Sequence, residues 1–122
     1  MLVADDDPEL LDVVASDLEH EEGADVVRVG DGASLIQEIA DGGPFDLIVT
    51  DIAMPWMSGL QAAHAARSAR IATPLLVMTA RHGGDIERQV DALGGNARLL
   101  RKPFELRELH AAVASLLAGR ST

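Results

Sequence analysis

The side chains best suited to chemistry in this sequence directly follow apolar segments. They are Asp5, Asp6, Asp7, Asp51, Thr79 and Lys102, the only lysine of the chain. Several carboxylates close together repel one another unless a cation neutralises them. Oxygen ligands without histidine or cysteine favour Mg²⁺, which usually binds through carboxylates, water and a substrate phosphate. If these groups meet in the fold, they would suit the transfer of a phosphoryl group to a carboxylate.

An aspartate in such a site would attack the phosphoryl donor and become an aspartyl phosphate, while a metal offsets the charge. A lysine ammonium group would contact one phosphoryl oxygen, and a threonine hydroxyl could donate a hydrogen bond to another. Each residue also has a structural interpretation when it is taken alone. The three consecutive aspartates could cap a helix, and Asp51 could occupy a turn. Thr79 could be purely structural, and Lys102 could be a solvated lysine.

Strand-like and helix-like segments must position these groups, and they alternate along the chain. Nearly continuous aliphatic runs predict buried strands at residues 2–4, 45–50 and 74–79, and residues 25–29 and 97–101 are also strand-like but more polar. Apolar residues at helical spacing predict helices from Pro8 to near Gly23, over 33–40, over 60–70, from Asp85 to near Gly94, and over 106–117. Such alternation is typical of a parallel α/β sheet with helices on both faces. Five strand–helix units are too few for a closed eight-stranded barrel, so we predict an open doubly wound sheet.

The order of these segments places the reactive side chains at one edge of the predicted sheet. In an open parallel sheet, ligands bind outside the carboxyl ends of the strands. The three aspartates follow the first strand, and Asp51 follows the third. Thr79 ends the fourth strand, and Lys102 follows the fifth. This shared position favours a joint site over the separate structural interpretations.

Length and composition fit one domain that spans residues 1–122. The net charge of −10 disfavours direct binding to nucleic acid, which needs a cationic face. No apolar run approaches the roughly 18 residues that a membrane span needs. The absence of cysteine excludes disulfides and zinc–thiolate sites, and a reducing cytoplasm is the expected location.

Four segments of the sequence carry a family resemblance. They are Val3–Pro8, Asp51–Gly59, Val77–Ala80 and Lys102–Phe104. In this order and at this spacing they resemble the receiver domain of response regulators in two-component systems, over essentially the whole chain. The resemblance implies a flavodoxin-like, CheY-like α/β fold of five parallel strands and five helices, with the strand order 2-1-3-4-5. It also implies a domain that accepts a phosphoryl group from the phosphohistidine of a histidine kinase or a phosphotransfer protein.

The resemblance implies a metal site around the phosphoacceptor. Asp51 would accept the phosphoryl group. Mg²⁺ would be bound directly by Asp6, Asp51 and the backbone carbonyl of Ala53, with Asp5 acting mainly through water.

The resemblance also implies how the phosphoryl group is held and how its arrival is signalled. Thr79 and Lys102 would contact the phosphoryl group, and Ala53 and Arg81 would tune its lifetime. Movement of Thr79 would remodel the face made by the fourth helix, the fifth strand and the fifth helix. An unidentified downstream protein would bind or leave that face, and a homodimer could form there.

The sequence departs from the family pattern in three places. Leu99 stands three residues before the lysine, where the family usually has a tyrosine or phenylalanine that acts as a rotamer switch. A core leucine is the structural interpretation of this position. The segment from Gly94 to Arg98 is one residue longer than usual. No output domain is expected after the fifth helix.

Other functions compete with a phosphoacceptor. A phosphatase of the haloacid dehalogenase type would need a second aspartate two residues after the nucleophile, where this chain has Ala53. A nucleotide-binding domain would need a glycine fingerprint after the first strand, which this sequence lacks. The remaining alternative is a pseudo-receiver, an interaction module that works without phosphorylation, and Leu99 keeps it open. We therefore expect a signalling domain rather than an enzyme.

Overall fold

The computed structural model describes residues 1–54, 58–80, 84–94 and 96–120, in which strands and helices alternate. The strands are β1 (Leu2–Ala4), β2 (Val27–Val29), β3 (Ile48–Asp51), β4 (Leu75–Thr79) and β5 (Ala97–Arg101). The helices are α1 (Pro8–Glu22), α2 (Gly32–Asp41), α3 (Gly59–Ser68), α4 (Gly84–Asp91) and α5 (Leu106–Arg120). The predicted α/β alternation is confirmed. None of the described helices is both long and apolar enough to cross a membrane.

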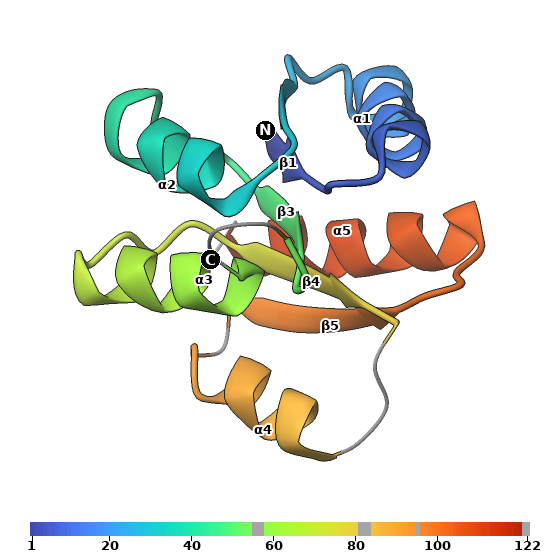
Figure 1. Ribbon diagram of the computed structural model, residues 1–122. Helices are drawn as coiled ribbons and strands as arrows, with labels where there is room; N and C mark the ends of the chain where they lie inside the picture. The colour runs from blue at the N-terminus through green and yellow to red at the C-terminus, as the bar shows by residue number, and fades with distance from the viewer. Residues whose placement is uncertain (55–57, 81–83, 95, 121–122) are drawn as a thin grey trace.

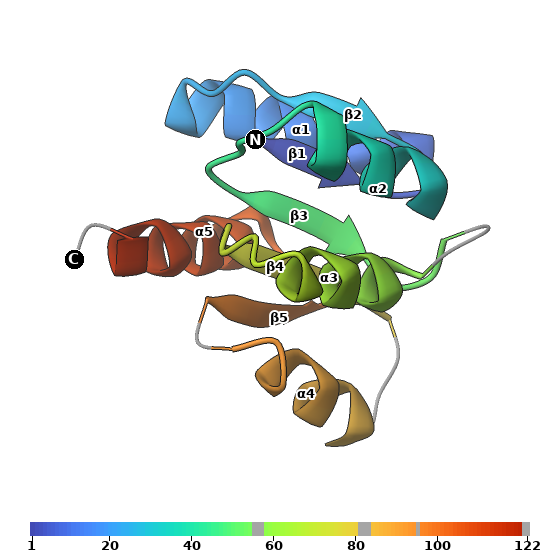
Figure 2. The same cartoon turned by 90° about the vertical axis from the view of Figure 1, so that its left-hand side faces the viewer.

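The strands form one parallel sheet with the order β2-β1-β3-β4-β5 (Figure 1). Figure 2 shows the arrowheads of β1, β2 and β3 pointing the same way. The predicted doubly wound sheet and its strand order are therefore confirmed. The register pairs Ala4 with Thr50, and Thr79 with Arg101. The carboxyl ends of β1, β3, β4 and β5 consequently meet at one edge.

Two hydrophobic cores lie on opposite faces of this sheet. In Figure 1, α1 and α5 lie to the right of the sheet, and α2 and α3 lie to the left. Successive strand residues point to opposite faces, so Val49 packs in the core that α1 and α5 cover, whereas Ile48 packs beneath α2, α3 and α4. Each fully buried aliphatic side chain contributes about 1.5–3 kcal/mol. Burial on both faces explains why β1, β3 and β4 are almost continuously apolar, whereas the outer strands β2 and β5 carry arginines and are partly exposed.

Two strands begin two or more residues later than the sequence predicts, and β4 begins one residue later, at Leu75 rather than residue 74. β3 begins at Ile48 rather than residue 45, and β2 begins at Val27 rather than residue 25. Both strands pair with β1, and Leu2 is the first residue of β1 to pair with either of them. The start of β1 therefore coincides with the start of regular pairing in β2, and the starts of β1 and β4 coincide with that in β3.

Helix α3 ends two residues before the predicted end at residue 70. Arg70 adopts a left-handed conformation with φ of 63°. The Ile71 N–H then donates to the Ala66 carbonyl at 3.0 Å, and the Arg70 N–H donates to the Arg67 carbonyl at 3.0 Å. This is the Schellman pattern of helix termination, which glycine usually provides. No sequence pattern marks an arginine that adopts the left-handed conformation. The predicted end of the helix at residue 70 was therefore wrong.

Arg67 joins three segments near the amino-terminal edge of β4 and β5. Its Nε donates to the Leu93 carbonyl at 2.9 Å. Its Nη1 donates to the carbonyls of Ile71 at 2.7 Å and Thr73 at 2.8 Å. Burial lowers the pKa of this guanidinium from its ordinary value. The side chain thus ties the end of α3 to the segments that precede β4 and β5.

Helices α1 and α5 are joined by a contact between side chains far apart in the sequence. His110 Nε2 on α5 lies 2.7 Å and 2.9 Å from the two carboxylate oxygens of Asp17 on α1. The Asp17 side chain is 11% exposed, so its carboxylate is largely withdrawn from water. The hydrogen bond to Asp17 and the charges of Asp17, Glu21 and Glu22 together outweigh desolvation and raise the pKa of His110.

We expect the contribution of the His110–Asp17 pair to stability to depend on pH. Because the folded-state pKa of His110 is raised, the charged pair contributes fully below the ordinary histidine value of about 6.5 and is lost as pH rises through the folded-state value. His110→Gln should therefore lose more stability, relative to the unsubstituted chain, at about pH 6 than at about pH 9. Urea unfolding at both pH values measures the two losses. His64→Gln, at an exposed position on α3, is the control, and equal losses from His110→Gln at both pH values would contradict a charged pair.

Candidate functional site

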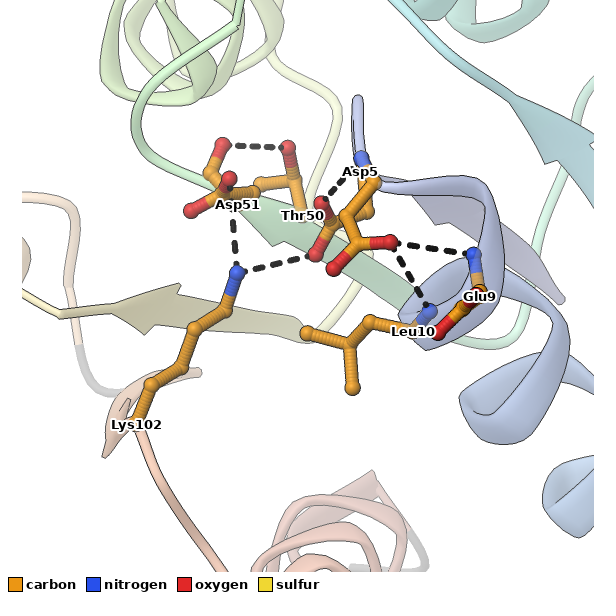
Figure 3. Close-up of polar contacts among 7 residues, drawn as sticks. Asp5, Glu9, Leu10, Thr50, Asp51 and Lys102 are labelled. Atoms are coloured by element: carbon orange, nitrogen blue, oxygen red, sulfur yellow. Dashed lines mark hydrogen bonds and ion pairs between the residues drawn. The ribbon is translucent and has the colours of Figure 1, made fainter.

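Lys102 bridges two aspartates at the carboxyl edge of the sheet (Figure 3). Its Nζ donates to Asp5 Oδ2 at 3.0 Å and lies 3.4 Å from Asp51 Oδ2. The side chains of Asp5 and Asp51 are 0% and 9% exposed, and that of Lys102 is 18% exposed. Asp5 follows β1, Asp51 ends β3 and Lys102 follows β5. The structure thus brings together groups from three strands, as the sequence predicts.

The three consecutive aspartates have separate roles. Asp7 is the N-cap of α1, and its carboxylate accepts from the N–H groups of Glu9 at 3.0 Å and Leu10 at 3.4 Å. Asp5 is buried and accepts from the Asp7 N–H at 2.9 Å. Asp6 is exposed. The helix-cap interpretation therefore holds for Asp7, while Asp5 and Asp6 belong to the cluster around Asp51.

The electrostatics of the cluster favour an additional cation. Burial, followed by the charge of Asp5, raises the pKa of the Asp51 carboxyl, and Lys102 and the Ala53 N–H offset this only in part. Burial opposes the charge of Lys102, but its hydrogen bonds with Asp5 and Asp51 and their charges outweigh burial and raise its pKa. The lysine therefore remains an ammonium group. One ammonium cannot balance three ionised carboxylates, so negative charge is left over when all of them ionise.

The donor set suits a hard divalent cation. One carboxylate oxygen from each of Asp5, Asp6 and Asp51 lies within 4.8 Å of the others. Carboxylate oxygens at such spacing, with room for water, are the ligands that Mg²⁺ prefers. The exposed Asp6 provides the open side of the cluster. The residues present therefore fit the predicted magnesium ion.

Thr79 lies at the same edge, at the end of β4. It is 1% exposed, and its backbone carbonyl accepts from the Lys102 N–H at 2.7 Å. This bond holds the start of the segment after β5 beside the end of β4. An open cavity of about 740 Å³ adjoins the carboxylate of Asp6, with Ala53 and Ser58 also in its lining. A small phosphodonor could approach the cluster through this cavity.

Two of the remaining predicted positions, Ala53 and Leu99, lie in the described part of the chain. Ala53 is exposed, and its N–H donates to the Asp51 carboxylate. Leu99, at the predicted switch position, is partly buried on β5 and packs against the core beneath α2, α3 and α4. This contact fits the interpretation of a core leucine. Arg81 lies outside the described residues.

Gly59 contacts the site, although no sequence pattern predicts a role for it. It is the first residue of α3, and Ser58 before it is the N-cap, in a capping box with Gln61. A Cβ atom at Gly59 would lie 2.0 Å from the Asp51 carbonyl oxygen and 2.8 Å from Thr50 Oγ1. Only a glycine allows this approach. A helix start that touches a strand end is a tertiary contact, so the sequence pattern alone could not reveal it.

Fold and site together define a doubly wound α/β domain with an acidic, lysine-bridged carboxyl edge. Residues 1–114 match the response regulator receiver domain family. The chain belongs to this family, and it is a signalling domain of two-component systems.

Sequence relatives support this assignment. Over 95% of this chain, the transcriptional regulatory protein TcrA of Mycobacterium tuberculosis is 36% identical. Over 96% of the chain, CpxR of Escherichia coli, also a transcriptional regulatory protein, is 33% identical. The chain spans 45% of the length of TcrA and 48% of the length of CpxR. The similarity therefore concerns less than half of each relative.

Solved structures show the same fold. The receiver domain of the Francisella response regulator 1452 superposes with a TM-score of 0.86 at 28% identity, covering 99% of this chain and 97% of that one. The signal receiver domain of the putative response regulator NarL from Mycobacterium tuberculosis gives a TM-score of 0.85 at 30% identity, covering 97% and 94%. Both neighbours are receiver domains over nearly their whole length.

We expect Gly59→Ala to destabilise the domain, because the new methyl group must displace the Asp51 carbonyl or the start of α3. Overpacking of this kind costs about 1–3 kcal/mol. Urea unfolding measures the loss. Gly30→Ala is the matched control, because a Cβ there meets no atom closer than 3.8 Å and should be nearly neutral. Equal stability of the two variants would show that α3 does not pack tightly on Asp51.

Proposed function

We propose that this domain accepts a phosphoryl group on Asp51 from a histidine kinase or a phosphotransfer protein. One observation carries the proposal. The Lys102 ammonium group lies 3.0 Å from Asp5 and 3.4 Å from Asp51, in a cluster whose third carboxylate, Asp6, is exposed. A lone buried ion pair would need only one carboxylate. An arrangement with excess negative charge, an ammonium group and an open side suits an incoming phosphoryl group with its metal.

The chemistry follows from the positions of the side chains. A carboxylate oxygen of Asp51 attacks the phosphorus atom, the P–N bond to the donor imidazole breaks, and the imidazole takes a proton as it leaves. Lys102 needs only to shift from Asp51 toward the new phosphoryl oxygens to keep its charge paired. Asp5 holds Lys102 in place during this exchange. Phosphoryl transfer requires mainly such positioning and electrostatic stabilisation.

Mg²⁺ is the proposed cofactor, held by Asp6, Asp51 and the Ala53 carbonyl, with Asp5 acting through water. When bound, it neutralises charge on the carboxylates and on the phosphoryl oxygens. Its binding would also offset the burial and the charge of Asp5, which raise the pKa of the Asp51 carboxyl.

The phosphoryl group would be read out through Thr79. A hydroxyl at the end of β4 can donate to a phosphoryl oxygen on the neighbouring β3. Its movement would shift the balance between two packings of the face made by α4, β5 and α5, where a downstream protein or a second copy would bind. Leu99 lies on β5, partly buried. In this chain the leucine side chain would take the place of the family's aromatic rotamer switch, and it would respond to Thr79 only through changes in packing.

The biological output is proposed from the relatives. Because TcrA and CpxR are named transcriptional regulatory proteins, we propose that this receiver domain serves transcriptional control in the cytoplasm. The net charge of −10 supports a role through protein partners rather than through nucleic acid. The pseudo-receiver alternative gains no support from the geometry, because Asp5, Asp51 and Lys102 are in mutual contact.

We expect the chain to gain the mass of one phosphate when it is incubated with acetyl phosphate and Mg²⁺, and Asp51→Asn to abolish this gain. Intact mass spectrometry measures the adduct. Asp7→Asn is the matched control, because asparagine caps a helix as well as aspartate does and Asp7 lies outside the cluster. If the unsubstituted chain gains no Mg²⁺-dependent adduct with several donors, the domain is a pseudo-receiver.

We also expect Asp6→Asn to weaken Mg²⁺ binding on the order of tenfold or more, because one carboxylate ligand is lost. Isothermal titration calorimetry measures the affinity. The same variant should be no less stable than the unsubstituted chain without the metal, because Asp6 is exposed and its charge repels its neighbours. Unchanged Mg²⁺ affinity would remove Asp6 from the metal site.

A further inference from the structure

Thr50 makes a hydrogen bond that fixes the backbone of the proposed phosphoacceptor. It is 1% exposed and directly precedes Asp51 in β3. Its Oγ1 donates to the backbone carbonyl of Asp51 at 3.0 Å (Figure 3). Successive strand residues point to opposite faces, so the Thr50 side chain points to the face of Ile48, beneath α2 and α3. It therefore does not itself reach the phosphoryl position.

The Asp51 carbonyl lies just beyond the end of the regular pairing between β1 and β3. The last registered pair between β1 and β3 joins Ala4 to Thr50, so Asp51 stands one residue beyond it. On the other side, the Ile52 N–H donates to the Met78 carbonyl at 3.0 Å. The Thr50 hydroxyl supplies the Asp51 carbonyl with a donor at the point where β3 becomes a loop. A buried carbonyl without a donor would be costly.

The start of helix α3 packs against the Asp51 carbonyl and the Thr50 hydroxyl. The Gly59 N–H donates to the Ile52 carbonyl at 2.9 Å. The space for a Cβ on Gly59 is occupied by the Asp51 carbonyl oxygen, 2.0 Å away, and by Thr50 Oγ1, 2.8 Å away. The hydroxyl, the carbonyl and the start of α3 are therefore packed against one another. None of the three can turn without moving the others.

The orientation of the Asp51 carbonyl determines the path of the next residues. Rotation of that carbonyl would swing the loop that carries Ala53, whose N–H donates to the Asp51 carboxylate. We propose that Thr50 is a positioning residue: its hydroxyl holds the Asp51 carbonyl against α3, and thereby holds the carboxylate and the Ala53 segment in the geometry for phosphoryl transfer. This inference rests on the proposed function of Asp51.

The test compares Thr50→Val, which keeps the shape but removes the donor, with Thr50→Ser, which keeps the hydroxyl. The rate of phosphorylation by acetyl phosphate with saturating Mg²⁺ is followed by intact mass against donor concentration, well below each unfolding midpoint. We expect Thr50→Val to lower the plateau rate on the order of tenfold, because a small misplacement of a reacting group slows chemistry strongly. The half-saturating donor concentration should stay the same. Thr50→Ser should keep the plateau rate of the unsubstituted chain.

Thr73→Val is the matched control, because Thr73 precedes β4 at the opposite edge of the sheet, and it should leave the plateau unchanged. A purely structural role for Thr50 would lower the unfolding midpoint of Thr50→Val but not its plateau rate, and would overturn the inference. Equal slowing by Thr50→Val and Thr50→Ser would also overturn it, because the hydroxyl would not be the group that matters.

Three further outcomes are decisive. If Thr50→Val does not fold, Thr50→Cys replaces it, since a thiol is only a weak donor, and an unchanged plateau rate in that variant overturns the inference. If the unsubstituted chain accepts no phosphate, the proposed function fails and the inference fails with it. If the unsubstituted chain accepts phosphate and Thr50→Val matches it, only the inference on Thr50 fails.

Discussion

The positive charge of Lys102 stabilises the carboxylates at the carboxyl edge of this sheet. Asp5 follows β1 and Asp51 ends β3, and both are buried; burial and then the charge of Asp5 raise the pKa of the Asp51 carboxyl. Lys102 reaches both carboxylates from the far side of β4. The strand order therefore matters chemically, because it brings an ammonium group from the last strand to carboxylates on two central strands.

The packing around this edge serves that charge arrangement. The Lys102 N–H donates to the Thr79 carbonyl at 2.7 Å. This hydrogen bond attaches the lysine backbone to β4 and so fixes the point from which its side chain extends. Asp7 caps α1 and donates its own N–H to Asp5. The loop from β1 into α1 thus orients one buried carboxylate through the backbone. Removing a single partner from such a group would leave a buried charge unbalanced, which is costly in a protein interior.

Much of this arrangement could be predicted from the sequence. The alternation of apolar runs and helical spacing predicts the α/β class, and the polar residues after the runs predict the edge at which Asp51 and Lys102 meet. The family resemblance implies different roles for Asp5 and Asp6, but it does not reveal that Asp7 alone caps α1, because adjacent identical residues differ only in the direction that the turn gives each side chain. The early end of α3 depends on the left-handed conformation of Arg70, which arginine seldom adopts. The contact of Gly59 with Asp51 arises only when α3 packs on the sheet.

The opposite edge of the sheet is held by a different kind of contact. Arg67 binds the backbone carbonyls of Ile71, Thr73 and Leu93 rather than carboxylates. Every residue type has a carbonyl, so the side chains at those three positions can be exchanged without removing an acceptor, provided that the backbone keeps its course. The hydrogen bonds of this junction therefore depend on the side chain of Arg67 alone. Leu93 and Ile71 are constrained instead by their packing in the core beneath α2, α3 and α4.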